Sequence, residues 1–162
     1  MQEFLLSIVN GIPKEIGLII IAMIPIGELR GSIPIGIGVF KMNWITVFVL
    51  SVIGNMIPVF FVMYLIEPIY NLLKKIKFFD KFFTWLFERT RKKFYAKHKS
   101  MGDIALIFFV GIPLPVTGAW TGSLAAWLFG IPPKKALPLI FFGVIMAGVI
   151  VTIFSMGIIS IF

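Results

Sequence analysis

The sequence predicts an all-α integral membrane protein, built as an inverted repeat of a re-entrant helical hairpin followed by a transmembrane helix. Of its 162 residues 59% are hydrophobic, above the roughly 45–50% of soluble domains. Three stretches without charge each exceed the roughly 20 apolar residues that span a bilayer: Trp44–Ile66, Ile104–Pro133 and Ala136–Phe162. The hexad Gly27–Ser32 also has a counterpart in Gly118–Ser123. Paired hydrophobic segments interrupted by Gly and Pro indicate a transporter's binding site.

The N-terminal region predicts a short interfacial helix and then a broken membrane segment. Residues Met1–Asn10 are expected to form the first helix, and Pro13 suits the first turn of a helix from Lys14 to about Pro25. Closely spaced prolines and glycines then favour a hairpin over Gly17–Phe40 instead of a straight span. Such backbone is tolerated at membrane depth only where protein or trapped water satisfies it. The residues expected to shape this hairpin are Pro25, Gly27, Gly31, Ser32 and Pro34.

A span, a basic connector and a second broken segment come next. Asn43 is a suitable N-cap for the span Trp44–Ile66. Residues from Ile69 to about Phe94 place apolar side chains on one helix face and basic side chains mostly opposite. The second hairpin is expected over Ile104–Gly130, and the final span over about Lys134–Ile159. The residues expected to shape the second hairpin are Pro113, Pro115, Gly118 and Gly122.

The chain therefore divides into a first repeat (residues 1–66), a basic amphipathic connector (67–103) and a second repeat (104–162). Ten lysines and arginines lie between Pro68 and Asp103. A basic run can bind nucleic acid, but here it is better explained by orientation, because Lys and Arg collect in cytoplasmic loops. No nucleic-acid partner is expected. The amphipathic helix either lies in the headgroup region of an anionic leaflet or packs against the protein's own core or a second subunit.

Charge placement predicts a multi-pass plasma membrane protein with the connector in the cytoplasm. If both broken segments are hairpins, the first enters and leaves from outside and the second from inside. Lys134 and Lys135 then face the cytoplasm, as the positive-inside rule requires. If both segments crossed fully, these lysines would face outside. The two halves are therefore expected to be inverted copies, with a substrate site near the midplane and alternating access.

Glu28 and Arg30 are the only charges in the first broken segment, and ionisable groups at membrane depth by default mark a functional site. Desolvation favours the neutral form of a carboxyl group, so Glu28 can exchange protons. Arg30 stays charged and presents a planar fork to phosphate or carboxylate. The pair is expected to bind an anionic group and couple its movement to protons. The alternatives are a structural ion pair that closes the hairpin tip, or side chains that reach an interface.

Hydroxyl groups replace these charges in the second half. They can bond a phosphate or another solute, and they can equally satisfy broken backbone. These residues are Thr117, Thr121 and Ser123.

The composition excludes several classes of site. The chain has no cysteine, which removes disulfides, thiolate metal sites and thiol nucleophiles. The single histidine, His98, lies among lysines and is expected at the surface. With so few titratable groups, no enzymatic activity, metal site or cofactor is expected. Membrane lipids are the expected partners, and a homodimer is a candidate assembly because four membrane elements make a small body.

The motifs resemble those of the small multi-drug export protein family. They read Glu28-x-Arg30-Gly31-Ser32-Ile33-Pro34, then Pro113-x-Pro115-x-x-Gly118 and Thr121-Gly122-Ser123, and the resemblance covers nearly the whole chain. The layout is also distantly similar to the DedA superfamily, whose members have two re-entrant hairpins and some of which move polyprenyl-phosphate lipid carriers. This similarity implies that the acidic position of the first DedA hairpin falls on Glu28. The second DedA hairpin usually carries arginines beside its prolines, where this chain has Val110 and Thr117.

Three functions are compatible with the sequence. The favoured one is a proton-coupled transporter or translocase of an anionic lipid carrier or amphiphile. The second is an exporter of small cationic hydrophobic compounds, in which Glu28 binds proton and drug in competition; the nearby Arg30 argues against a cation site. The third is a non-transport membrane scaffold or assembly factor, which would tolerate the loss of both charges.

Overall fold

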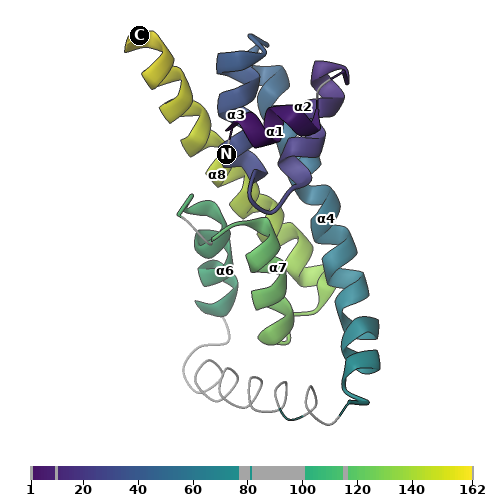
Figure 1. Cartoon of the computed structure of the whole chain (residues 1–162). Coiled ribbons are helices and arrows are strands. Elements are labelled where there is room, and N and C mark those ends of the chain that lie inside the picture. Colours follow the sequence, from purple (N-terminus) through teal and green to yellow (C-terminus); the bar gives the residue numbers. More distant parts are fainter. Residues whose placement is uncertain (1, 10, 77–80, 82–100, 115–116, 162) are drawn as a thin grey trace.

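The computed structural model describes residues 2–9, 11–76, 81, 101–114 and 117–161 as a bundle of helices (Figure 1). No strand occurs within these ranges. The all-α class predicted from the sequence is confirmed. Within the same ranges, two helices are long and apolar enough to cross a membrane, α4 and α8. In chain order the elements are α1 (Gln2–Ile8), α2 (Lys14–Met23), α3 (Glu28–Pro34), the π-helix η1 (Ile35–Val39), α4 (Trp44–Leu73), α6 (Met101–Gly111), α7 (Ala119–Leu128) and α8 (Pro133–Ile161).

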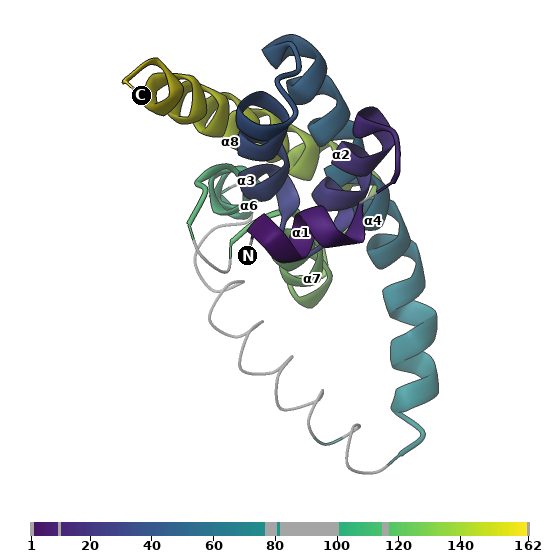
Figure 2. The ribbon, with the colours of Figure 1, turned by 45° about the horizontal axis from the view of Figure 1, so that its top comes forward.

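The boundaries of α4 confirm one expectation and correct another. The Asn43 side chain accepts a hydrogen bond from the Ile45 N–H at 2.9 Å, so the predicted N-cap is confirmed. The predicted end of this helix at Ile66 is wrong, because α4 continues through Pro68 to Leu73. Proline has a φ angle that fits a helix, and it removes only one backbone hydrogen bond. α4 consequently extends beyond α7 at its C-terminal end (Figures 1 and 2).

The predicted amphipathic connector helix falls mostly on residues that the structure does not describe. Its first residues, Ile69–Leu73, belong to α4. Residues 77–80 and 82–100 lie outside the described ranges.

Each broken segment folds back on itself. In the first half, the Lys14 ammonium group at the start of α2 donates to the Phe40 carbonyl just after η1, at 3.2 Å. In the second half, Asp103 in the first turn of α6 pairs with Lys135 in the first turn of α8, at 2.5 Å. Each segment therefore starts and finishes at the same end of the molecule. The two tips approach from opposite ends and meet in the middle (Figure 1).

Glycines allow close helix contacts in both halves. A Cβ atom on Gly54 of α4 would lie 2.7 Å from the Ile19 carbonyl oxygen of α2. A Cβ atom on Gly143 of α8 would lie 2.9 Å from the Ile107 carbonyl oxygen of α6. Small residues let helix backbones approach this closely in membrane proteins. The first helix of each hairpin is thus packed against the long helix that follows it through a glycine in equivalent position.

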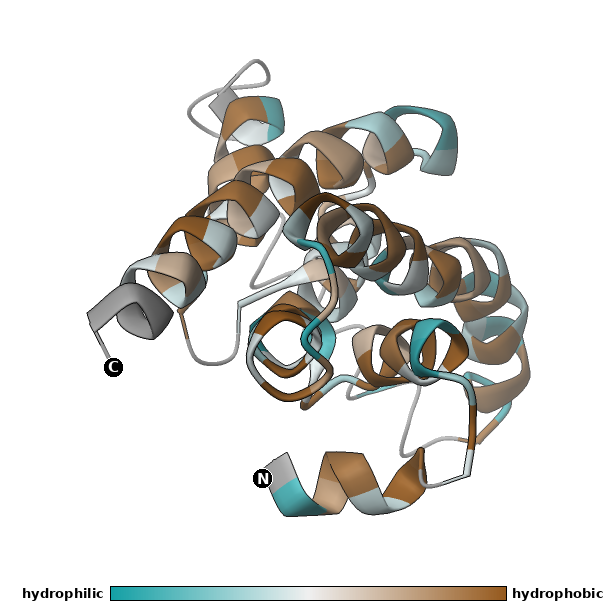
Figure 3. Ribbon diagram, turned by 90° about the horizontal axis from the view of Figure 1, so that it is seen from above, coloured by the Kyte–Doolittle hydropathy of each residue, from teal (hydrophilic) through white to brown (hydrophobic). Residues whose placement is uncertain are grey.

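The outer surface of the bundle is apolar. Seen from above, most turns of the helices consist of hydrophobic residues (Figure 3). Large side chains of α4 and α8 are more than half exposed, which suits contact with lipid acyl chains and not with water; examples are Phe61, Phe142, Ile153 and Phe154.

We expect Gly54→Ala and Gly143→Ala each to lower the free energy of unfolding by about 1–3 kcal/mol, because the added methyl group overpacks a helix contact. Thermal unfolding of the purified protein in detergent measures the effect. Gly157→Ala is the matched control in α8, since a Cβ atom there would meet nothing within 4 Å. If all three variants melt alike, close packing through these glycines does not stabilise the bundle.

Candidate functional site

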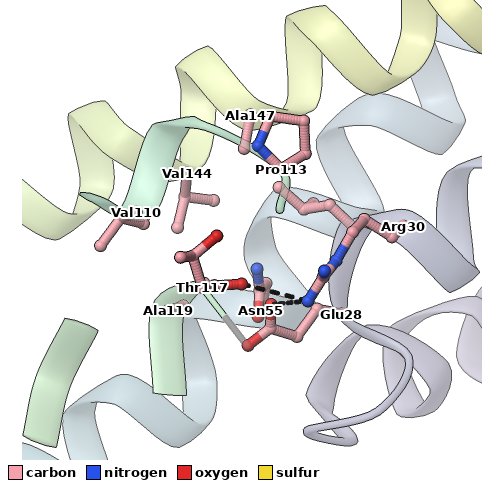
Figure 4. Close-up of a pocket in the computed structure, with 11 residues that line it drawn as sticks. Glu28, Arg30, Asn55, Val110, Pro113, Thr117, Ala119, Val144 and Ala147 are labelled. Atoms are coloured by element: carbon pink, nitrogen blue, oxygen red, sulfur yellow. Dashed lines mark hydrogen bonds and ion pairs between the residues drawn. The ribbon is translucent and has the colours of Figure 1, made fainter. Parts of the chain in front are cut away.

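A small cavity lies where the two hairpin tips meet (Figure 4). Its volume of about 10 Å³ suits roughly one water molecule. Residues from α3, α4, the α6–α7 hairpin and α8 contribute to its wall. They are Glu28, Leu29, Arg30, Asn55, Val110, Pro113, Thr117, Gly118, Ala119, Val144 and Ala147.

Glu28 is buried and contacts the second hairpin. The turn after α2 places this residue in the left-handed region, with φ 43°, and its exposed fraction is 5%. Its carboxylate Oε1 accepts a hydrogen bond from the Trp120 backbone N–H, at 3.4 Å. That N–H belongs to the first turn of α7, where the backbone donors have no partner within the helix. A negative charge at a helix N-terminus is also favoured by the helix dipole.

Gly118 makes room for this contact. It is the N-cap residue of α7 and has φ 155°, a conformation that L side chains rarely adopt. A Cβ atom at this position would overlap with the carboxylate of Glu28. The glycine therefore allows the acidic side chain to reach the N-terminus of the helix.

Arg30 holds the irregular loop of the second hairpin. Its Nη1 donates to the Leu114 carbonyl at 2.5 Å and its Nη2 to the Thr117 carbonyl at 3.1 Å. The Nη2 atom also lies 3.7 Å from the Glu28 carboxylate, as an ion pair. The planar guanidinium can serve two acceptors at once. The fork thus supplies hydrogen bonds to two carbonyls that lie outside the helices, those of Leu114 and Thr117.

Trp120 makes the reciprocal contact from the second hairpin to the first. Its indole N–H donates to the carbonyl of Met23, the last residue of α2, at 3.0 Å. The last carbonyls of a helix lack partners within the helix. This bond was not among the contacts expected from the sequence. The signal available was that Trp120 is the only residue of its hexad whose side chain carries an N–H group.

The three candidate hydroxyls divide into two kinds. Thr117 lines the cavity with Glu28 and Arg30, and its hydroxyl donates to the Ile112 carbonyl of its own loop at 2.7 Å. Thr121 and Ser123 do not line the cavity. Their hydroxyls donate to carbonyls of the preceding turn: Thr121 to Gly118 at 3.3 Å and Ser123 to Ala119 at 2.7 Å. The structure therefore brings together Glu28, Arg30 and Thr117, and adds the buried Asn55.

The residues expected to shape the hairpins occupy two settings. Pro25 and Gly27 lie in the first tip, and Pro113 and Gly118 lie in the second. The others with described positions lie inside helices: Gly31, Ser32 and Pro34 in α3, and Gly122 in α7. Pro115 lies outside the described residues.

The site has no evident metal-binding character. Among the residues with described positions, no group of three or more His, Asp or Glu side chains could hold a metal ion. The ionisable groups of the cavity wall are Glu28 and Arg30.

Comparison with known proteins identifies one family. The family model described as "Putative small multi-drug export protein" matches residues 28–150 of the chain. This match starts at Glu28 and includes the wall of the cavity from both hairpins. No curated protein and no solved structure gives a significant match. Together with the two apolar helices, the family match identifies a membrane protein.

We expect Gly118→Ala and Glu28→Ala to be energetically coupled. Each single substitution should destabilise the protein, the first by driving the carboxylate from the α7 N-terminus and the second by leaving that terminus unsatisfied. In the double variant the clash is absent, so its loss of unfolding free energy should be about 0.5–3 kcal/mol smaller than the sum of the two single losses. Chemical unfolding in detergent gives the four free energies.

Gly11→Ala is the control for this cycle. Gly11 also has a positive φ of 81°, but a Cβ atom there would meet nothing within 4 Å. Its combination with Glu28→Ala should be additive. Additive losses for the Gly118 pair would mean that backbone strain alone explains this glycine.

Proposed function

Because the chain belongs to the small multi-drug export protein family, we propose that it is a membrane transporter whose substrate site lies between the tips of two re-entrant hairpins. The substrate is an anionic lipid carrier or a similar anionic amphiphile, and its movement is coupled to protons. One observation carries the proposal: where the tips meet, the buried Glu28 carboxylate contacts both the N-terminus of α7 and the Arg30 guanidinium, and all of these groups border one small cavity. Transport is favoured over catalysis because this cavity offers few titratable groups.

The packing of the two halves supports an inverted repeat. In each half a polar contact brings together the ends of the broken segment, and a glycine of the following long helix contacts the first hairpin helix. The hairpins enter the bundle from opposite ends (Figure 1). Inverted repeats of this kind place the substrate site at the repeat interface near the bilayer midplane and operate by alternating access.

The contacts of Glu28 support an anionic substrate coupled to protons. Two groups that bind anions, the α7 N-terminus and the Arg30 guanidinium, converge on the Glu28 carboxylate. When a proton from water adds to this carboxylate, its charge is cancelled and its attraction to both groups weakens. A phosphate or carboxylate group of the substrate then takes its place. Release of the proton restores the Glu28 contacts and expels the anion.

An apolar groove supports an amphiphile over a small soluble anion. It lies between α4 and α8 and has a volume of about 440 Å³. Met56 in the wall of the groove directly follows Asn55 in the wall of the cavity. An amphiphile whose headgroup binds at the tips would therefore have its acyl chain close to the groove. The groove is lined by Val52, Ile53, Met56, Ile57, Phe60, Leu137, Pro138 and Phe141.

Export of small cationic hydrophobic compounds is the alternative, and the family description favours it. An acidic side chain at membrane depth suits a cationic drug. Arg30 at 3.7 Å from the Glu28 carboxylate disfavours it, because a second cation would be repelled. A non-transport scaffold remains the third reading. In each case membrane lipids are the surrounding partners, and a homodimer is our proposed assembly.

The proposed orientation in the plasma membrane can be tested with single cysteines, since the natural chain has none. Lys41 and Lys134 are both exposed. Lys41 lies just before α4 and Lys134 lies in the first turn of α8, at opposite ends of the molecule. We expect Lys41→Cys to react with an impermeant thiol reagent added outside intact cells. Lys134→Cys should react only after permeabilisation, because its end and the 67–103 connector face the cytoplasm. Labelling of Lys134→Cys from outside would invert the topology.

Transport can be measured in proteoliposomes that contain a fluorescent phosphate-monoester lipid, with a pH gradient across the membrane. Quenching by external dithionite reports how much lipid has crossed. We expect Glu28→Gln to remove the gradient-dependent crossing while the protein remains folded, because the amide cannot take up and release a proton. Arg30→Lys should lower the rate about tenfold or more, since a point charge does not replace the fork.

The controls separate the candidate functions. Glu15→Gln, an exposed substitution in the first turn of α2, should transport like the natural protein. A fluorescent phosphocholine lipid tests whether an anionic headgroup is required, and ethidium release tests cation export. Ethidium release that needs Glu28, without lipid crossing, would favour the drug exporter. Normal crossing in both Glu28→Gln and Arg30→Lys would contradict the site.

A further inference from the structure

Four buried polar atoms have no hydrogen-bond partner within the described part of the chain: Ser32 Oγ, Ser51 Oγ, Asn55 Oδ1 and Thr152 Oγ1. A buried polar group without a partner costs free energy. Serine and threonine in helices can avoid this cost by donating to the carbonyl four residues earlier. Ser123 and Ser155 do so, each at 2.7 Å. The four unpartnered groups are therefore exceptions that need an explanation.

The register between α3 and α4 places two of these groups opposite each other. At one level, a Cβ atom on Gly36, just after α3, would lie 2.7 Å from a methyl carbon of Val47. At another level, Glu28 and Asn55 line the same cavity. Residue numbers rise along one helix and fall along the other between these two contacts, so α3 and α4 are antiparallel.

Ser32 and Ser51 lie midway between these contacts. Ser32 is four residues from both Glu28 and Gly36, and Ser51 is four residues from both Val47 and Asn55. Four residues are about one helical turn, or roughly 6 Å along the axis. The two hydroxyls are thus expected one turn away from the cavity, on facing helices, and both side chains are completely buried.

Thr152 continues the series toward the same end. A Cβ atom on Gly148 of α8 would lie 2.8 Å from the Phe48 ring near the start of α4. Thr152 is one turn beyond this contact, and α8 runs opposite to α4. The unpartnered groups consequently extend from the cavity toward the end of the molecule at which α4 begins.

The second hexad differs from the first in this respect. Ser123 occupies the last position of the second hexad, as Ser32 does in the first. Ser123 lies four residues from Ala119 in the cavity wall, as Ser32 lies four residues from Glu28. Its hydroxyl, however, is bonded within its own helix. Among the residues with described positions, the unpartnered polar groups therefore lie on one side of the cavity.

We propose that Ser32, Ser51 and Asn55 bind a chain of water molecules that conducts protons to Glu28 from the end where α4 begins. A buried water typically needs two to four polar partners, which two hydroxyls and an amide oxygen provide. Each water accepts a proton on one side and passes another on, and the Glu28 carboxylate takes the last one. Arg30 is the only other ionisable group in the described cavity wall, and it stays charged.

The role of this water chain rests on the proposed function, and the chain adds the side of the membrane from which protons reach Glu28. In the proposed orientation, the end at which α4 begins faces outside. Protons then reach Glu28 from outside, whereas the Ser123 hydroxyl on the cytoplasmic side is bonded within its own helix and offers no site for such a water chain. An inward proton gradient would thus protonate Glu28, and the groups that contact its carboxylate would become available to the substrate anion.

Cysteine S–H groups test the path directly. The natural chain has no cysteine, so the S–H stretching band of a single Ser51→Cys or Ser32→Cys variant is free of background. After transfer of the purified protein to D₂O, infrared spectra follow the exchange of S–H to S–D. We expect both positions to exchange about tenfold or more faster than Ser123→Cys, because only they contact water.

Slow exchange at position 51, equal to that at position 123, would overturn the path, and fast exchange at all three positions would overturn its one-sidedness. Ser51→Cys carries the test alone if Ser32→Cys does not fold. No substrate is present, so the result is separable from the transport assay. Slow exchange with normal lipid crossing removes the path alone. Fast S–H exchange without Glu28-dependent lipid crossing would show that the buried site is hydrated and would contradict its role in transport.

Discussion

The fold depends on how polar groups are satisfied where two broken segments meet in an apolar environment. Breaking a helix frees backbone donors and acceptors, and lipid offers them no partners. The two tips solve this problem for each other. Glu28 accepts from the first turn of α7, Arg30 donates to two carbonyls of the loop before it, and Trp120 donates to the last carbonyl of α2. Because every one of these bonds crosses between hairpins, neither tip is expected to keep its shape without the other.

This arrangement explains why the two hexads differ although they occupy equivalent places. Charge is needed on one side only, since a single carboxylate and a single guanidinium supply both an acceptor and a forked donor. The second hexad instead supplies Gly118, which leaves room for the Glu28 carboxylate, and the small Ala119 beside it. A second acidic side chain at Ala119 would place like charges in a cavity of about 10 Å³.

Much of the fold could be predicted from the sequence, because the lengths of uncharged segments and the positions of Pro and Gly act locally. The Asn43 cap and the return of each broken segment belong to this class. The end of α4 could not be predicted, since Glu67 and Pro68 mark a helix end as readily as its continuation. For the site, Glu28 and Arg30 stood out as the charges of an apolar segment. Their partners did not, because backbone groups carry no sequence signal. The sequence likewise could not show that the Thr121 and Ser123 hydroxyls donate to carbonyls of the preceding turn, since a hydroxyl can bond either to its own helix or to a neighbouring group.

A structural role of the charge pair is compatible with the transport role that we propose for it. An ion pair that only closed the tips would require a well-satisfied surrounding, because unpartnered buried groups cost free energy without any gain. In the described surroundings, however, the Asn55 Oδ1 atom in the cavity wall and two hydroxyl oxygens one turn away have no hydrogen-bond partner. Hydrogen bonds to charged groups contribute about 1.5–3 kcal/mol each. Protonation of a carboxylate removes its charge and therefore weakens these bonds. In the proposed transport cycle, the contacts that close the tips are therefore also the contacts that protonation of Glu28 opens.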